Sequence, residues 1–289
     1  MTESIYRTLH DPHARRRIDD WCDARLSAWD VPHRREHRDT VAGPTHVLTA
    51  GDPDVPVAVV LVPGANACAA AHLPALTALA ARGHVVAPDV PGEPGLSSGR
   101  RVEGARVHQL GAWLDEVVTR LDRPVVLVGH ALGAAAALAA SSPLVVGRVL
   151  VSPGGLRRPR LPLRMVAAVA RWRATPRPTT SYRLLEHLVA PAERVDPTLV
   201  EWLTLVGRHV RPGFVPGRQA DRITDALRSR PPVVTAGVHD RLLPPAHVAP
   251  AARRLLGAGV VPLACGHLPD PAAWGHVAGT VDALVARRS

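Results

Sequence analysis

The sequence predicts an α/β fold with a mostly parallel central sheet that is flanked by helices. Short runs of β-branched and other apolar residues alternate with helical stretches, which is typical of strand–helix–strand units. The runs are apolar throughout, as expected of parallel strands that are buried on both faces. The chain has 289 residues, of which 46% are hydrophobic, so it can fill the core of one large domain with an insertion.

The first half of the chain carries the regular part of this alternation. An amphipathic helix with a structural role is expected first, within an N-terminal segment over residues 1–34. The first two strands after it are expected to be joined by a tight turn at residues 51–54. The expected helices cover residues 11–27, 69–82 and 103–121, and the expected strands cover residues 45–50, 56–62, 85–88 and 125–128.

The second half departs from the alternation once. Residues 156–230 contain proline clusters and three helical patterns, and we interpret this segment as a helical lid inserted between two strands. The α/β core then consists of residues 35–155 and 231–289. Its remaining strands are expected over residues 148–152, from residue 232 and over residues 260–263, and its remaining helices over residues 246–256 and 271–285.

At the centre of the chain, one strand turns sharply into a helix at Gly129-His130-Ala131-Leu132-Gly133. The spacing is that of a Gly-x-Ser-x-Gly nucleophile elbow, a strained turn that lifts one side chain above the sheet. Only glycine leaves room on either side of it. The apex residue here is Ala131. Alanine has no hydroxyl to activate, so this chain cannot form an acyl-enzyme at that position.

Five motifs in order resemble the α/β-hydrolase superfamily, in particular its bacterial esterase-like members. The resemblance runs from about residue 40 to the C-terminus and implies the α/β-hydrolase fold with a helical lid. Each motif lies on an expected loop after a strand, and their order is that of the family. The motifs are residues 62–65 (Val-Pro-Gly-Ala), residues 89–97, the elbow at residues 129–133, residues 237–240 (Gly-Val-His-Asp) and residues 266–267 (Gly-His).

The resemblance also implies a set of site residues. Ala131 stands where the family has its serine nucleophile, Asp240 where it has the acid and His267 where it has the general base. The backbone N–H groups of Ala65 and Leu132 would form the oxyanion hole. This chain departs from the family at the first of these loops, since Pro-Gly replaces the common His-Gly there, a change that keeps the backbone donors.

No other side chain is expected to replace the missing nucleophile. Cys265 lies at a strand end and Cys68 at the start of a helix, where small thiols commonly pack into the core. Ser97 and Ser98 lie on a loop and are interpreted as turn or capping residues.

Composition excludes several classes of function. The chain has no lysine, which rules out Schiff-base chemistry and a Walker lysine. Its three scattered cysteines fit neither a disulfide framework nor a zinc site, so we expect a reducing cytoplasm and no metal. We also expect no cofactor. We expect neither a signal peptide nor a membrane span, although residues 124–147 carry no charge. One phenylalanine and no recognisable binding module argue against nucleic acid.

The formal net charge of +10 is concentrated in the first part of the expected lid. Eight arginines precede the next acidic residue there, which is Glu186. An acidic partner, such as an acyl carrier protein or a phosphorylated thioester, would suit such a surface. A solvated arginine-rich surface is the simpler interpretation. The arginines are Arg157, Arg158, Arg160, Arg164, Arg171, Arg173, Arg177 and Arg183.

Three functional hypotheses follow from these residues. The first is an ester or thioester hydrolase whose serine was replaced on purpose, an inactivated Ser-to-Ala variant. The second is a natural member without a nucleophile, in which the His267–Asp240 pair does acid–base chemistry as in a lyase, a cyclase or a cofactor-free oxygenase. The third is a non-catalytic ligand-binding or scaffold protein, which ranks last because an inert chain would have no chemical need for both residues.

Overall fold

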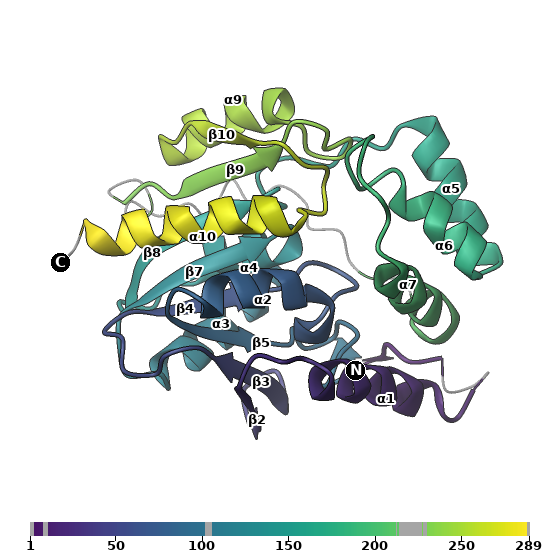
Figure 1. Ribbon diagram of the computed structural model, residues 1–289, viewed down its shortest axis with the longest axis horizontal. Helices are drawn as coiled ribbons and strands as arrows, with labels where there is room; N and C mark the ends of the chain where they lie inside the picture. The colour runs from purple at the N-terminus through teal and green to yellow at the C-terminus, as the bar shows by residue number, and fades with distance from the viewer. Residues whose placement is uncertain are drawn as a thin grey trace.

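The computed structural model describes residues 3–7, 11–101, 106–211, 213, 227 and 230–287. Its core is an eight-stranded sheet with the strand order β10-β9-β8-β7-β4-β5-β3-β2 (Figure 1). A separate two-stranded sheet pairs β1 (Glu3–Ser4) with β6 (Arg100–Arg101). The strands of the main sheet are β2 (His33–Arg38), β3 (Thr45–Ala50), β4 (Ala58–Val62), β5 (His84–Pro88), β7 (Val125–His130), β8 (Val145–Val151), β9 (Val233–Gly237) and β10 (Val260–Leu263).

The main sheet is parallel except at one edge, where β3 pairs antiparallel with both β2 and β5. The central strand β7 is hydrogen-bonded to β4 on one side and to β8 on the other, and all six of its residues are buried. This confirms the predicted mostly parallel sheet. The carboxyl ends of β4, β7, β9 and β10 meet at one edge of a parallel sheet, so the loops that follow them lie close together.

Helices cover both faces of this sheet. Val126 and Val128 of β7 pack into a core with α2 (Leu73–Ala80) and α10 (Pro271–Ala286). Val125 and Leu127, which point the other way, pack into a second core. The helices of that second core are α3 (Arg106–Thr119), α4 (Leu132–Ala139) and α9 (Pro245–Leu256).

Three helices lie between β8 and β9, within the segment expected to be a lid. They are α5 (Leu163–Ala174), α6 (Pro178–Leu185) and α7 (Pro197–His209), and they stand beside the sheet in Figure 1. The N-terminal helix α1 (Ala14–Ser27) packs against α7, where the rings of Trp21 and Trp202 lie 4.5 Å apart. Residues 212, 214–226 and 228–229 of the expected lid, and residues 103–105 of an expected helix, lie outside the described residues.

Two local expectations differ from the structure. The helix expected over residues 69–82 is split into a 3-10 turn, η1 (Ala69–His72), and α2, because Pro74 has no backbone N–H to continue a helix from residue 69. The strands β3 and β4, expected to be joined by a tight turn, are not neighbours in the sheet, since β5 lies between them.

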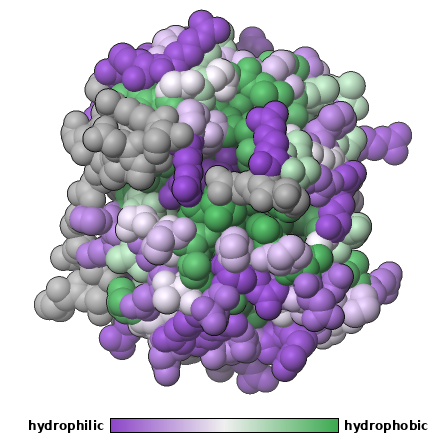
Figure 2. All heavy atoms as spheres, turned by 90° about the vertical axis from the view of Figure 1, so that its left-hand side faces the viewer, coloured by the Kyte–Doolittle hydropathy of each residue, from purple (hydrophilic) through white to green (hydrophobic). Residues whose placement is uncertain are grey.

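At the end of the molecule where α10 terminates, the surface is made of both apolar and polar side chains (Figure 2). Figure 2 shows this face, on which apolar patches are broken up by polar side chains. A hollow of about 320 Å³ lies there between α2, α10 and the residues before β4. Within the described ranges, no helix is both long and apolar enough to cross a membrane.

Candidate active site

The turn between β7 and α4 has the strained geometry of an elbow. Ala131 has φ 47° and ψ −105°, which non-glycine residues rarely adopt. Its N–H donates to the Val151 carbonyl (3.0 Å), and its own carbonyl accepts from the Gly154 N–H (3.0 Å). Hydrogen bonds to the segment after β8 therefore hold the strained residue in place.

The two glycines around this turn are required by packing. A Cβ on Gly129 would lie 2.6 Å from the backbone of Ala134, and a Cβ on Gly133 would lie 2.0 Å from the Val62 carbonyl oxygen. Either contact would force the backbone to shift, because real Cβ atoms essentially never approach other atoms so closely. The Gly-x-Ala-x-Gly spacing is thus explained by the close approach of α4 to β4 and β7.

Asp240 and His267 form a buried hydrogen-bonded pair beside this turn. Nδ1 of His267 lies 2.8 Å from Oδ2 of Asp240, and the other carboxylate oxygen accepts from the N–H groups of Leu242 (2.8 Å) and Leu243 (2.9 Å). A carboxylate can only accept, so His267 carries its proton on Nδ1. Nε2 of His267 is left as the basic nitrogen, with no hydrogen-bond partner among the described residues.

The Asp240 carboxylate is ionised at any physiological pH. Burial, the largest effect, raises its pKa, but the charge of His267, the hydrogen bond from it and the Leu243 N–H together lower the pKa to about 2. A fixed negative charge next to Nδ1 orients the imidazole and stabilises its protonated form. The pair can therefore accept a proton at Nε2.

Two glycines let the loops that carry this pair meet. A Cβ on Gly237 would lie 2.2 Å from the Gly266 carbonyl oxygen, and one on Gly266 would lie 2.3 Å from the Leu188 carbonyl oxygen. The Leu188 carbonyl in turn accepts from the Leu268 N–H (2.9 Å). The His267 loop is therefore packed between the Asp240 loop and the segment that follows α6.

The loop after β4 lies against the turn at Ala131. A Cβ built on Gly64 would come within 3.5 Å of the Ala131 Cβ. The N–H groups of Ala65 and Leu132, which the sequence analysis expects to act together, have no protein acceptor among the residues described. Two unpaired donors beside the apex are what an oxyanion would need.

Two side chains that the sequence analysis did not single out, those of Glu93 and Trp202, hold this loop through the backbone of Asn66. The Asn66 N–H donates to the Glu93 carboxylate (2.7 Å), and the Asn66 carbonyl accepts from Nε1 of Trp202 on α7 (2.8 Å). Asn66 itself has a positive φ of 57°. Glu93 belongs to the motif at residues 89–97, but nothing in the sequence signals that Trp202 reaches the loop from a helix 136 residues away.

Two buried histidines, His130 and His72, lie behind the His267 loop, and His130 contacts the backbone of His267. Nε2 of His130 lies 3.0 Å from the His267 carbonyl oxygen, which can only accept, so this nitrogen carries the proton. Burial lowers the pKa of His130 to about 3 and that of His72 to about 4, so both rings are neutral. Nδ1 of His72 lies 3.2 Å from the Cys68 carbonyl oxygen, and its Nε2 lies 3.3 Å from Nδ1 of His130. His130 thus ties the turn to the His267 loop.

Two thiols and one hydroxyl that the sequence analysis considered as substitute nucleophiles are not activated. Burial raises the pKa of Cys265 to about 12 and raises the pKa of Cys68 well above its usual value, so both stay protonated thiols. The Ser97 hydroxyl donates to the Asp89 carbonyl (2.7 Å) and accepts from the His46 N–H (2.8 Å). In the described part of the chain, no group of three His, Cys, Asp or Glu side chains is placed to hold a metal ion.

Comparison with known proteins places this geometry in a family. The model of the alpha/beta hydrolase family matches residues 59–275, a range that contains all five motifs and ends beyond His267. No curated protein matches the chain by sequence.

Several solved structures share the fold at low sequence identity. Carboxylesterase CesB from Bacillus subtilis is 18% identical, with a TM-score of 0.72 over 94% of this chain and 98% of that one. Naproxen esterase from the same organism is 17% identical, with a TM-score of 0.71 over 93% and 96%. A 2-hydroxy-6-oxo-6-phenylhexa-2,4-dienoate hydrolase from a Rhodococcus strain is 22% identical, with a TM-score of 0.63 over 89% and 99%. Together with the match over residues 59–275, this establishes that the chain belongs to the alpha/beta hydrolase family.

Proposed function

We propose that the chain is an ester- or thioester-hydrolase-type protein in which Ala131 replaces the serine nucleophile while the rest of the site is kept. The observation that carries this proposal is the strained backbone of Ala131, which stands beside the hydrogen-bonded His267–Asp240 pair. Strain of this kind is normally retained only where a side chain must be presented above the sheet. A nucleophile-free site that keeps this strain can still hold a small acyl substrate.

The chemistry left to the residues is base catalysis without a covalent intermediate. Ala131 offers no oxygen, so no acyl group can be transferred to the chain at this position. The free Nε2 of His267 can take a proton from water or from a bound substrate, and the N–H groups of Ala65 and Leu132 can stabilise negative charge on a carbonyl oxygen. Turnover by direct attack of water should be far slower than turnover through a serine ester.

Restoring the serine tests this proposal. A serine at position 131 adds one oxygen to a Cβ whose place is already set, so Ala131→Ser should complete a triad with His267 and Asp240. In a serine protease, loss of the nucleophile costs roughly a factor of a million in turnover. We therefore expect Ala131→Ser to raise the hydrolysis of activated esters or thioesters by several orders of magnitude. An acyl adduct at residue 131 should be detectable by mass spectrometry.

The control for this gain is the double variant Ala131→Ser with His267→Ala, which keeps the hydroxyl but removes its base. It should lose the gained activity and form no adduct. If Ala131→Ser folds with an unchanged melting temperature and neither hydrolyses nor becomes acylated across a broad panel of esters and thioesters, the hydrolase-type proposal is wrong.

A second candidate function is acid–base chemistry by the native chain itself, of the lyase, cyclase or cofactor-free oxygenase type. It is favoured by Asp240, whose pKa of about 2 keeps His267 oriented even though there is no serine to activate. In that case the unmodified protein turns over its own substrate, and His267→Ala abolishes the reaction while Ala131→Ser does not improve it. Activity that survives the loss of His267 would exclude this candidate, and ligand binding without any turnover would indicate a non-catalytic protein.

A further inference from the structure

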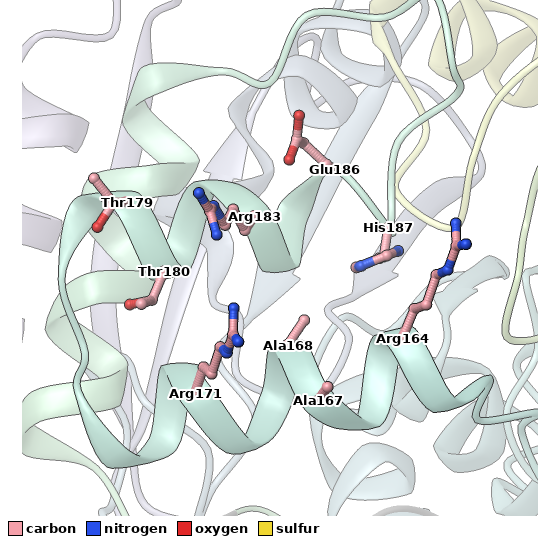
Figure 3. A pocket seen from close by; sticks show the side chains of 9 residues that line it. All are labelled: Arg164, Ala167, Ala168, Arg171, Thr179, Thr180, Arg183, Glu186 and His187. Atoms are coloured by element: carbon pink, nitrogen blue, oxygen red, sulfur yellow. The ribbon is translucent and has the colours of Figure 1, made fainter.

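The arginines of the segment between β8 and β9 are not spread evenly over its surface. Arg164 and Arg171 on α5 and Arg183 on α6 line one cleft of about 560 Å³ between the two helices. Figure 3 shows Arg171 and Arg183 pointing toward each other across this gap, with Arg164 beside His187 at its other end. Arg157 and Arg158 do not line this cleft.

The three guanidinium groups lack a fixed counter-charge. None of them makes a side-chain hydrogen bond or a salt bridge within the described part of the chain. Glu186 is the one acidic residue among those lining the cleft, so with a neutral histidine the formal charge of the lining is +2. All three arginines are exposed, so water and salt screen their mutual repulsion, and an anion held between them would lower it further.

Residues that carry further donors line the same cleft. α6 begins there at Pro178, and a guanidinium cannot accept a hydrogen bond, so the Arg177 side chain leaves the N–H groups of Thr179 and Thr180 without a side-chain acceptor. The partial positive charge of the helix start adds to that of the arginines. At the other end, Nδ1 of His187 accepts from Arg241 (2.9 Å), so the proton of this neutral ring is on Nε2, available as a donor.

We propose that this cleft binds the phosphate group of an organic phosphate, specifically the phosphorylated end of an acyl thioester. A tetrahedral phosphate presents three oxygens and up to two negative charges, so it can accept from α5 and α6 at once, and arginine forks match it well. The cleft is larger than one phosphate. It also shares Thr179, Arg183 and Glu186 with a groove of about 710 Å³ that is lined by apolar residues such as Val195 and Val200, which would accommodate the organic part.

The cleft is connected to the candidate active site through the chain itself. His187, in its wall, directly precedes Leu188, whose carbonyl accepts from the Leu268 N–H (2.9 Å) next to His267. A ligand held by its phosphate in this cleft would therefore bind against the segment that packs on the His267 loop. This inference deepens the proposed function and rests on it only for the thioester part of the ligand.

The proposal concerns binding and not turnover, so it can be tested with the unmodified chain, which keeps Ala131. Isothermal titration calorimetry with coenzyme A, pyrophosphate and phosphate-free pantetheine as probes separates the phosphate from the organic arm. We expect coenzyme A and pyrophosphate to bind and pantetheine to bind at least tenfold more weakly. Arg171→Gln and Arg183→Gln should each weaken coenzyme A binding about tenfold or more, since each removes a charge-assisted hydrogen bond. Glu186→Gln should tighten it severalfold.

Arg157→Gln and Arg158→Gln are the matched controls, because they remove the same charge from exposed arginines outside the cleft. Both should bind coenzyme A within about twofold of the unmodified chain, whose affinity should fall with added salt. The proposal is wrong if no phosphate probe binds at millimolar concentration, or if the control variants lose as much affinity as the cleft variants. It is also wrong if an acidic carrier protein binds and depends equally on Arg157 and Arg171, because that result would indicate a diffuse protein-docking surface. None of these outcomes depends on whether Ala131→Ser becomes active.

Discussion

At the scale of single residues, the site is defined by groups whose protonation is set by burial. Asp240 keeps its charge because His267 and two backbone N–H groups compensate for its burial. His130 and His72 are uncharged, because burial lowers the pKa of each ring and few nearby groups oppose that effect. The Asp240 carboxylate thus holds Nδ1 of His267 and the neutral His130 ring holds its carbonyl oxygen, which leaves Nε2 of His267 as the nitrogen that can accept a proton.

The neutral His130 predicts a specific loss of stability in acid. Its pKa is lowered from 6.5 to about 3, chiefly by burial. In the unfolded chain the ring takes up a proton near its ordinary pKa, so its contribution is intact above pH 6.5 and declines as the pH falls toward 3. The full decline corresponds to about 5 kcal/mol of unfolding free energy. His130→Gln, which cannot be protonated and still offers an N–H, should unfold at a lower pH than the unmodified chain.

Urea unfolding followed between pH 7 and pH 4 measures this difference. The control is His247→Gln, which removes a half-buried histidine whose Nε2 lies 2.9 Å from the Arg158 carbonyl oxygen. That variant should follow the pH profile of the unmodified chain. Parallel profiles for His130→Gln and the unmodified chain would contradict the neutral assignment of His130.

At the scale of elements, glycines decide how closely α4 approaches the sheet. Gly133→Ala would normally stabilise a helix, but here the new Cβ would lie 2.0 Å from the Val62 carbonyl oxygen. We expect this substitution to cost about 3 kcal/mol or more in unfolding free energy. The matched control is Gly275→Ala in α10, where an added Cβ meets nothing within 4 Å. That variant should gain up to about 1 kcal/mol.

Thermal and urea unfolding of the two variants give this comparison directly. Because both changes are the same substitution within a helix, helix propensity is matched and the contact is what differs. Equal effects of the two substitutions on stability would show that α4 can move away from β4, contrary to the packing described here.

The elements predicted correctly from sequence are those whose signal is local. The parallel strands are apolar runs. For β7, the sequence predicts a strand over residues 125–128, and the observed strand ends two residues later, at His130. The sequence does not predict the strand β2, because its residues His33–Arg38 are polar and mostly exposed, and within the sheet β3 is the strand that it pairs with. The break between η1 and α2 was missed although Pro74 signals it, since the apolar pattern continues across the proline.

At the scale of the whole molecule, the sequence could indicate which loops meet but not what supports them. Ala131, Asp240 and His267 follow parallel strands, so topology alone brings them to one edge of the sheet. The supporting contacts from His72 and Trp202 cross 58 and 136 residues of chain, and no local pattern encodes them. The His72 contact joins η1 to the end of β7, and the Trp202 contact depends on how α7 packs on the core.

Trp202 predicts how that support works. Its ring packs 4.5 Å from Trp21 of α1, and its Nε1–H donates to the Asn66 carbonyl in the loop after β4 (2.8 Å). Trp202→Phe keeps an aromatic ring against Trp21 but leaves that carbonyl without its donor. We expect it to lower the unfolding free energy by about 1–3 kcal/mol. It should also speed amide hydrogen exchange in the loop at residues 64–67, because opening the loop then costs less free energy once the hydrogen bond from Trp202 is gone.

The control is Trp29→Phe, which removes a similar hydrogen bond, from Nε1 to the Thr77 hydroxyl (3.0 Å), at a more exposed place. Hydrogen exchange followed by mass spectrometry should show faster exchange at residues 64–67 in Trp202→Phe and unchanged exchange there in Trp29→Phe. If the loop is equally protected in both variants, α7 does not hold it, and the unpaired N–H of Ala65 must be positioned by the turn at Ala131 and by Glu93 alone. A loop that loosens only in Trp202→Phe would mean that α1, α7 and the candidate oxyanion loop act as one supporting unit.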